Sequence, residues 1–534
     1  MPGWNFADVW ETVAETLPDA TAQVQGDRRF TWSELDRRAD GIAATLLGFG
    51  VERQDKVAQY LHNCPEYLES MFGIYKVALV PVNTNYRYAD EELLYLWDNA
   101  DAVAVVFHGT FTERIEGLRE RLPKIKGWIW VDDGSGPCPG WAVPYEEAAA
   151  SASARTAAPW GRDGDDLYML YTGGTTGMPK GVMWRQDDIF STLNSVAAVI
   201  YGDTPDLDVV RTSLTQAGPV ALPACPLMHG TGAFTSFSAL SIGGCIVTLE
   251  SRTLDVDELL STIEREKVNT VAIVGDAFAK PMLRALDADP GRWDVSSLVM
   301  LVSSGVMWSE ATKQGLLKHH AGMLCVDAFS SSEALGMGQS VSSAAGATKT
   351  AKFALGQNAR VVTEDGRDVE PGSGEIGMVA VKGRTPVGYY KDPEKSERTF
   401  RVIDGQRYSI PGDYATVEAD GTLKLLGRGS VCINTGGEKV YPEEVEEVLK
   451  EHTAVRDAVA VGVPDDKWGE AIVAMVEAHP GAALQEDEVI AHVKSRLAGF
   501  KAPKRVLEVT TIGRAPNGKV DYKRLRDEAV ARLG

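Results

Sequence analysis

Hydrophobic residues in the first part of the chain follow two alternating spacings. From residue 32 to 49 they recur every three or four positions, which is typical of one helix face, whereas residues 56–61 have the pattern of a short strand. Further apolar runs follow at 244–249, 270–274 and 297–302, each near a helical or glycine-rich segment. The alternation predicts an α/β fold whose large N-terminal domain consists of layered mixed sheets with helices.

The last hundred residues show a different pattern. Two strand-like runs, 455–463 and 470–478, flank a turn at 464–469, and a helical pattern follows over 486–498 with Gly499 as its cap. These elements predict a small α+β unit of about a hundred residues, a normal size for an independent domain.

Length and charge narrow the class of protein. A chain of 534 residues is too long for one core, and its 44% hydrophobic fraction is ordinary for a globular protein. The formal net charge of −21 at pH 7 argues against a nucleic-acid or anionic-membrane surface. We therefore expect small-molecule partners and no nucleic acid.

Cysteine usage and the N-terminus bear on location. The six cysteines are scattered, with no CxxC spacing, which fits reduced thiols and gives no signal for a metal site. The chain begins Met-Pro-Gly-Trp-Asn without a basic and then apolar leader, and no later run approaches about eighteen apolar residues. The sequence predicts a cytoplasmic protein with no integral membrane segment.

A glycine- and threonine-rich run follows the predicted strand 167–171. Residues 171–181 read Tyr-Thr-Gly-Gly-Thr-Thr-Gly-Met-Pro-Lys-Gly, in which glycines free the backbone to turn N–H groups toward an anion and the hydroxyls and lysine add donors and charge. A Walker loop is excluded because Lys180 is followed by glycine, not by serine or threonine. We expect phosphate contacts from Thr172, Gly173, Gly174, Thr175, Thr176, Gly177 and Lys180.

This run resembles the phosphate-binding signature of the adenylate-forming superfamily, which contains acyl-CoA synthetases, firefly luciferase and the adenylation domains of peptide synthetases. The resemblance implies an N-terminal AMP- and acyl-binding domain over residues 1–427, a hinge at 428–430 and a small mobile C-terminal lid domain over 431–534. It also implies that the protein uses ATP and Mg²⁺, that CoA is a co-substrate and that a carboxylic acid is the other substrate. It leaves a homodimer open.

The segment 329–333, Phe-Ser-Ser-Ser-Glu, resembles the superfamily's Tyr-Gly-x-Thr-Glu. The resemblance implies that Glu333 and Thr175 bind Mg²⁺, that Phe329 stacks on adenine and that Ser332 faces the α-phosphate, with Asp327 also on the nucleotide. One carboxylate is enough, because Mg²⁺ usually keeps several waters and bridges nucleotide phosphates. The phenol that the family usually has is absent here.

Two further segments resemble nucleotide contacts. Asp413, in Pro-Gly-Asp where the family has Thr-Gly-Asp, falls on the residue that binds the ribose, and a carboxylate can accept from both hydroxyls. Fifteen residues later, Arg428 matches an arginine that reaches the ribose or a phosphate. The nucleotide is also expected to border a loop of small residues at Ser304, Gly305 and Val306.

Near the C-terminus, Lys519 follows Asn-Gly and resembles the lysine that enters the active site from the small domain, where its charge would offset charge building on the α-phosphate. His229 matches a family histidine beside the acyl pocket, and a hydrogen-bonded core histidine explains it equally well. Ser430 stands where the family's hinge generally has Asp or Lys. The loop at Gly436 and Gly437 resembles the one beside the pantetheine tunnel. The implied catalytic residues are Lys519, Thr175, Glu333 and His229.

The chemistry implied by the resemblance has two halves. A carboxylate is a poor acyl donor, and an acyl-AMP mixed anhydride gives it a better leaving group before a thiol attacks. The sequence segments 182–185, 274–278 and 386–390 resemble those of actinobacterial acyl-CoA ligases that act on steroid side chains. We therefore expect an acyl-CoA ligase for a bulky steroid side-chain acid or a medium- or long-chain fatty acid.

Other functions stay open at this point. A stand-alone adenylation domain would load an amino acid onto a carrier protein and would need an acidic residue near the substrate amine, for which Asp276 is placed. A nonenzymatic nucleotide-binding protein and a luciferase-type oxidase would carry the same signature.

Overall fold

The computed structural model describes residues 3–174, 177–195, 201–306, 308–435, 438–465, 468–497, 499–515 and 518–533. Its contacts divide the chain into two compact units. The first comprises residues 1–173, 178–350 and 381–409, and the second comprises residues 174–177, 351–380 and 410–534. This division differs from a single cut at residue 427, and the mobile domain and the hinge stay predictions.

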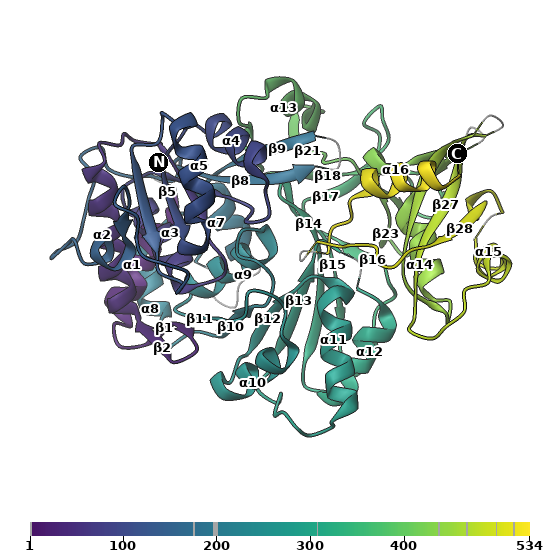
Figure 1. Ribbon diagram of the computed structural model, residues 1–534, viewed down its shortest axis with the longest axis horizontal. Coiled ribbons are helices and arrows are strands. Elements are labelled where there is room, and N and C mark those ends of the chain that lie inside the picture. The colour runs from purple at the N-terminus through teal and green to yellow at the C-terminus, as the bar shows by residue number, and fades with distance from the viewer. Residues whose placement is uncertain are drawn as a thin grey trace. The chain divides into compact units, whose positions relative to one another are not determined.

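The first unit contains two sheets (Figure 1). The first sheet is parallel from β1 to β14, with an antiparallel strand beyond each of these. From β2 to β15 its strands are, in spatial order, β2 (Arg28–Thr31), β1 (Thr21–Gln25), β11 (Cys245–Thr248), β10 (Val220–Pro223), β12 (Thr270–Ile273), β13 (Met300–Ser304), β14 (Leu324–Ser331) and β15 (Ala334–Ser342).

The second sheet is parallel from β8 to β7, and β9 pairs antiparallel with β19 at its other end. Its strands are, in spatial order, β19 (Gly388–Tyr389), β9 (Gly177–Arg185), β8 (Leu167–Gly174), β4 (Val80–Asn83), β3 (Lys56–Tyr60), β5 (Ala102–His108), β6 (Gly127–Val131) and β7 (Val143–Pro144).

Helices separate and cover the two sheets. One core lies between the sheets and includes side chains of α1, α2, α3 and α9, a second lies under α10, α11 and α12, and a third lies under α4 and α5. The predicted layered α/β arrangement is thereby confirmed. The helices of this unit are α1 (Phe6–Thr16), α2 (Trp32–Gly48), α3 (Pro65–Lys76), α4 (Asp90–Asn99), α5 (Thr112–Leu118), α6 (Tyr145–Ala149), α7 (Gln186–Asn194), α8 (Leu207–Ser213), α9 (Gly230–Leu240), α10 (Val256–Glu266), α11 (Gly275–Ala288), α12 (Glu310–His319) and α13 (Pro393–Thr399), and the hairpin β20 (Phe400–Ile403) and β21 (Gln406–Ser409) follows α13.

Large aromatic side chains fill these cores. The fully buried tryptophans all belong to the first unit, and they are Trp4, Trp10, Trp32, Trp97, Trp184 and Trp308. In the second unit, Trp468 is partly exposed instead.

The predicted helix 32–49 is α2, and its start has a local cause. The Thr31 hydroxyl accepts from the Glu34 N–H at 3.2 Å, and the Glu34 carboxylate accepts from the Thr31 N–H at 2.8 Å, which is a capping box. The predicted strands at 56–61, 244–249, 270–274 and 297–302 correspond to β3, β11, β12 and β13.

The second unit joins two distant stretches of chain through strand pairing. β16 and β18 come from one stretch and pair antiparallel with β23 and β22 from the other, and β22 pairs with β23. This pairing explains why residues 351–380 group with residues beyond 410. These strands are β16 (Lys352–Leu355), β17 (Ala359–Val362), β18 (Gly377–Lys382), β22 (Asp413–Val417) and β23 (Leu423–Arg428).

The C-terminal part of this unit is a sheet with helices on both faces. α14 and α15 share one core with the sheet, and α16 shares the other. This arrangement is the small α+β unit that the sequence predicts. Its elements are β24 (Ile433–Thr435), β25 (Glu438–Val440), α14 (Pro442–Lys450), β26 (Val455–Asp465), β27 (Gly469–Ala478), α15 (Glu486–Lys494), β28 (Arg505–Glu508) and α16 (Tyr522–Leu533).

Two predicted boundaries in this part are wrong. β26 runs to Asp465, which pairs with Gly469, so the strands extend into the expected turn. The predicted helix 486–498 ends at Lys494, and Gly499 begins a short 3-10 helix instead of capping it. Just after the helix end, the Ser495 hydroxyl donates to the His492 carbonyl at 2.7 Å, a side-chain bond that competes with helical pairing.

Among the described residues, none of the helices combines the length and apolarity needed to cross a bilayer.

Candidate functional site

The run expected to bind phosphate lies on two neighbouring strands, which we call the phosphate hairpin. β8 ends at Gly174 and β9 begins at Gly177, and the two strands are neighbours in the second sheet. The incoming strand carries Thr172, Gly173 and Gly174, and the outgoing strand carries Gly177 and Lys180. Thr175 and Thr176 lie outside the described residues. The run therefore follows a strand, as predicted, and a second strand leads away from it, where a Walker loop would lead into a helix.

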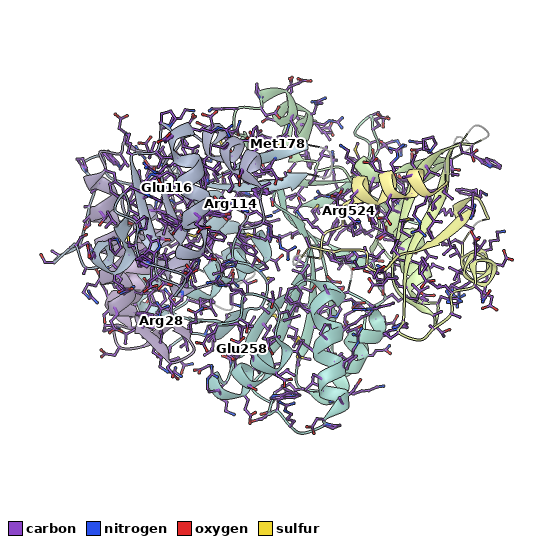
Figure 2. All side chains as sticks on the ribbon, viewed as in Figure 1. Arg28, Arg114, Glu116, Met178, Glu258 and Arg524 are labelled. Atoms are coloured by element: carbon purple, nitrogen blue, oxygen red, sulfur yellow. The ribbon has the colours of Figure 1, made fainter. Side chains whose placement is uncertain are left out.

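Lys180 forms an ion pair with Asp392. The Lys180 ammonium holds the pKa of Asp392 below its usual range, and Asp392 also accepts from the Lys395 N–H at 3.0 Å at the start of α13. The Lys180 side chain is one-third exposed at 35%, and Met178 nearby on the same strand is also exposed (Figure 2). An incoming phosphate could therefore compete with Asp392 for this cation.

Glu333 is buried in the turn between β14 and β15, and its carboxylate is held by a tyrosine. The Tyr389 hydroxyl donates to Glu333 Oε1 at 2.7 Å, and the Ser409 hydroxyl donates to the Glu333 carbonyl at 2.6 Å. One carboxylate oxygen is thus fixed in place by a phenol while the other stays available to a ligand. A single oriented carboxylate fits Mg²⁺ that also binds phosphates and water.

The outgoing strand β9 connects the phosphate hairpin to the acidic turn. Trp184 on β9 donates its indole N–H to the Ser332 carbonyl at 2.9 Å, and Val182 on β9 pairs with Tyr389 on β19. Lys180, Ser332 and Glu333 therefore belong to one connected group within the first unit. No set of three or more metal-ligating His, Cys, Asp or Glu side chains occurs in the part of the chain that the structure describes.

The segment expected to border the adenine lies across two paired strands. Ser304 ends β13 opposite Ala328 on β14, and Asp327 stands opposite Ser303. Gly305 follows with φ +92°, a conformation that favours glycine, and Val306 packs on the core under α10 to α12. Phe329 is buried, and its residue type is apolar and planar as stacking requires.

Asp327 is a buried acid beside a buried base. Burial raises the pKa of Asp327 to about 7, the nearby Lys313 ammonium lowers it and the Asp276 carboxylate raises it. The Lys313 side chain is fully buried, and its Nζ lies 4.0 Å from Asp327 Oδ2. Perturbed acids and bases in one place are typical of functional sites.

His229 stands at the N-cap of α9 and is partly exposed. The segment before it is fixed by two asparagines. Asn83 donates to the Met228 carbonyl at 2.8 Å and the Tyr171 carbonyl at 2.9 Å, and accepts from the Tyr171 N–H at 2.6 Å. Asn63 donates to the Cys225 carbonyl at 3.0 Å. Asn83 thus joins strand β8, at Tyr171, to the segment that leads to His229.

In the second unit, Asp413 and Arg428 face each other across β22 and β23. Arg428 Nε donates to Asp413 Oδ1 at 3.1 Å, while Asp413 Oδ2 is buried and has no hydrogen-bond partner among the described residues. Such an oxygen is costly unless a ligand uses it, and a ribose hydroxyl would be a suitable donor. Gly427 has φ +131°, and a side chain there would collide with the Glu443 carboxylate.

Lys519 is exposed in the second unit, and backbone hydrogen bonds join its neighbours. The Gly518 N–H donates to the Ala515 carbonyl at 2.7 Å and the Ala515 N–H donates to the Lys519 carbonyl at 2.9 Å. The Arg514 guanidinium donates to the Gly518 carbonyl at 3.2 Å and also pairs with Asp457. Gly436 and Gly437, the predicted loop beside the pantetheine, lie outside the described residues.

Sequence reasoning did not assign Tyr389, Asn83 or Lys313. Asn83 had one local signal, because it is a polar residue directly after the apolar strand residues Val80 to Val82. The partners of Tyr389 and Lys313 are distant in sequence, and only the folded sheets bring them together.

Two family models match the chain. The model described as "AMP-binding enzyme" matches residues 10–390, and the one described as "AMP-binding enzyme C-terminal domain" matches residues 444–519. A medium/long-chain-fatty-acid–CoA and 3-oxocholest-4-en-26-oate–CoA ligase of Mycobacterium marinum is 39% identical, over 99% of this chain and 97% of its own. A 3-oxocholest-4-en-26-oate–CoA ligase of Rhodococcus rhodochrous is 38% identical, over 98% of this chain and 96% of its own.

A solved structure has the same fold. The crystal structure of an anthranilate CoA ligase in complex with anthranoyl-AMP superposes with a TM-score of 0.85 at 21% sequence identity, covering 100% of this chain and 98% of that one. This likeness confirms the predicted fold class, a large N-terminal domain followed by a small C-terminal one.

Proposed function

Because the chain belongs to the AMP-binding enzyme family, we propose that it is an ATP-dependent acyl-CoA ligase, which activates a carboxylic acid as an acyl-adenylate and then forms its CoA thioester. The observation that carries the proposal is the 38–39% identity to CoA ligases across nearly the whole length of both chains. Products of the first step are acyl-AMP and pyrophosphate, and AMP leaves in the second.

In the first step a carboxylate oxygen attacks the α-phosphorus and the bond to pyrophosphate breaks. Lys180 and the N–H groups of the phosphate hairpin would bind the phosphates, and Asp413 would hold the ribose through its unpartnered oxygen. Lys519 would offset the charge that builds on the α-phosphate. Glu333, fixed by Tyr389, and Thr175 would hold Mg²⁺, which when bound offsets the charge of the nucleotide phosphates.

In the second step the CoA thiolate attacks the acyl carbonyl and AMP leaves. The adenylate is the better leaving group, so the hard step is divided into two easier ones. His229 would lie beside the acyl group, with its segment held by Asn83 and Asn63. The small C-terminal domain would move between the two steps, with the hinge at residues 428–430.

The acid is proposed to be apolar and long or bulky. The relatives from Mycobacterium marinum and Rhodococcus rhodochrous carry the names of ligases for medium- or long-chain fatty acids and for a cholestenoate side-chain acid. The sequence segments 182–185, 274–278 and 386–390 of this chain also resemble those of such ligases. We therefore place both substrate classes first in the test below.

An amino-acid adenylation domain is the second candidate, and Asp276 weighs against it. Asp276 Oδ1 accepts from the Ser309 N–H at 3.1 Å and the Ser309 hydroxyl at 3.0 Å, while Oδ2 pairs with Lys280 at 3.1 Å. Both oxygens of the Asp276 carboxylate therefore already have partners within the protein, which argues against a role in binding a substrate amine.

The direct test is incubation with ATP, Mg²⁺, CoA and a mixed panel of fatty, aromatic, steroid side-chain and amino acids, followed by mass spectrometry of the products. We expect apolar acyl-CoA thioesters together with AMP. Acyl-AMP without a thioester would favour a carrier protein as acceptor. A complete lack of pyrophosphate release with every acid would reject the ligase and favour a nucleotide-binding protein.

A further inference from the structure

Lys313 on α12 is a buried cation with an incomplete set of partners. Its side chain has no exposed surface, and its nearest carboxylate oxygen, on Asp327, is 4.0 Å away. The other fully buried lysine ion pair of the first unit differs: Lys76 Nζ lies within 2.6–2.9 Å of Glu11, Asp36 and Asp40. Burying an ammonium is unfavourable unless it is well paired. A structural ion pair of the Lys76 type therefore does not account for Lys313.

The remaining contacts hold the Lys313 ammonium in place without neutralising it. Nζ donates to the Thr348 hydroxyl at 3.2 Å, and that hydroxyl lies 2.9 Å from Ser342 Oγ and 3.1 Å from Ser340 Oγ. Nζ also lies 5.9 Å from the centre of the Trp308 ring. Hydroxyls and an aromatic face orient a cation but supply no negative charge.

Asp327 is the group that this cation faces. It stands on β14 opposite Ser340 of β15, two residues before Phe329, so alternation places Asp327 and Phe329 on the same face of the sheet. The other titratable groups that act on the pair are Asp276 of α11, Glu310 of α12 and Cys325 of β14. Lys313 is the cation among them.

We propose that Lys313 is a positioning residue for nucleotide recognition: its charge favours the ionised form of Asp327, and the ionised Asp327 carboxylate selects a base that offers an amino group at its 6-position. This inference rests on the proposed function, because it takes Asp327 and Phe329 to border the base. Lys313 itself touches no substrate and acts through Asp327.

The selectivity follows from hydrogen-bond chemistry. An ionised carboxylate only accepts, so it can bind the 6-amino group of adenine and repels the 6-oxo group of hypoxanthine. A protonated carboxyl can donate to that oxo group, and the discrimination is then lost. Hydrogen bonds to charged groups are strong enough that the loss corresponds to a change on the order of ten- to hundredfold.

The pH dependence has a definite sign. The pKa of Asp327 is raised to about 7, so the carboxylate forms as pH rises through that value. Lys313 opposes the rise, because a nearby cation favours the ionised acid. Preference for ATP over ITP, the hypoxanthine nucleotide, should therefore increase between about pH 6 and pH 8 in the native enzyme. Without the Lys313 charge the same increase should occur at higher pH.

The experiment compares kcat and KM for ATP and ITP from pH 6 to pH 9 in the full-length native enzyme and in Lys313→Met, Lys313→Arg and Lys318→Met. Lys318 is an exposed residue of the same helix and serves as the matched control. AMP and IMP binding, measured by calorimetry, give the same ratio without turnover. Thermal unfolding shows which variants are folded.

We expect Lys313→Met to lose ATP preference by about ten- to hundredfold at pH 7.5, mainly through KM, while Lys313→Arg and Lys318→Met keep it. An unchanged ratio in Lys313→Met, or an equal loss in Lys313→Arg, would overturn the inference. A native ATP:ITP ratio that is flat from pH 6 to pH 8 would overturn it too, whether or not Lys313→Met folds. If the native enzyme releases no pyrophosphate with any nucleotide, the proposed function fails instead.

Discussion

Tyr389 and Tyr390 are neighbours in sequence that make different contacts. The Tyr389 hydroxyl donates to buried Glu333 at 2.7 Å, whereas the Tyr390 hydroxyl donates to Asp101 at 2.7 Å near the surface. Replacing either tyrosine by phenylalanine removes the hydrogen bond that its hydroxyl donates to a carboxylate. The pair therefore separates support of the proposed metal ligand from a general loss of stability.

We expect Tyr389→Phe to raise the Mg²⁺ concentration needed for half-maximal pyrophosphate release by about tenfold, because the Glu333 carboxylate loses the bond that orients it. Tyr390→Phe should leave that concentration unchanged. A Mg²⁺ titration of both variants measures this. An equal shift in the two would assign the effect to stability.

For single residues, the sequence predicts the proposed ligand-binding side chains better than the residues that hydrogen-bond to them. Glu333 and Lys180 are found from the local order of residue types. Their partners are 56 and 212 residues away, so only the folded strands bring Tyr389 and Asp392 to them.

The end of strand β4 is the element that links two parts of the proposed site. Asn83 stands there, bonded to Tyr171 at the phosphate hairpin and to Met228 just before α9. Asn63 holds only the second of these segments, through the carbonyls of Pro223 and Cys225 and the Leu227 N–H.

Asn83→Ala should lower the free energy of unfolding by about 2–4 kcal/mol, because it leaves buried backbone groups of both segments without partners. It should also raise KM for both ATP and the acid. Asn63→Ala should raise KM for the acid alone. Steady-state kinetics with thermal unfolding check this, and equal effects of both variants on ATP would contradict the assignment.

Elements with strong periodicity are predicted well, and their ends are not. The start of α2 is marked by its capping box. The helix predicted over 486–498 is four residues too long, because the apolar spacing continues past Lys494, where the helix ends. Leu497 still packs on the core beside α15 without being helical. Hydrophobic periodicity indicates which residues are buried or partly buried, and here such positions continue beyond the last helical residue.

The proposed catalytic and nucleotide-binding residues are divided between the two units. Lys180, Glu333 and His229 belong to the first unit, and Asp413 and Lys519 to the second. The sequence predicts two domains from a change of pattern. It does not predict that 351–380 joins the later residues, because that grouping depends on pairing between strands far apart in the chain.

Lys519→Ala should abolish most acyl-AMP formation and still convert supplied acyl-AMP to the thioester, because the charge is needed only while pyrophosphate leaves. Lys523→Ala, on the exposed side of the adjoining helix α16, is the matched control and should change neither half-reaction. The two half-reactions are assayed separately. Equal loss of both in Lys519→Ala would refute the division of roles.

The uneven distribution of buried tryptophans has an optical consequence. Of the chain's twelve tryptophans, only Trp468 belongs to the second unit, and it is 37% exposed. Intrinsic fluorescence of the native protein should therefore be dominated by blue-shifted emission from the first unit, with Trp468 contributing a red-shifted component that quenchers reach first. A single excitation wavelength can thus follow the two units separately as denaturant is added.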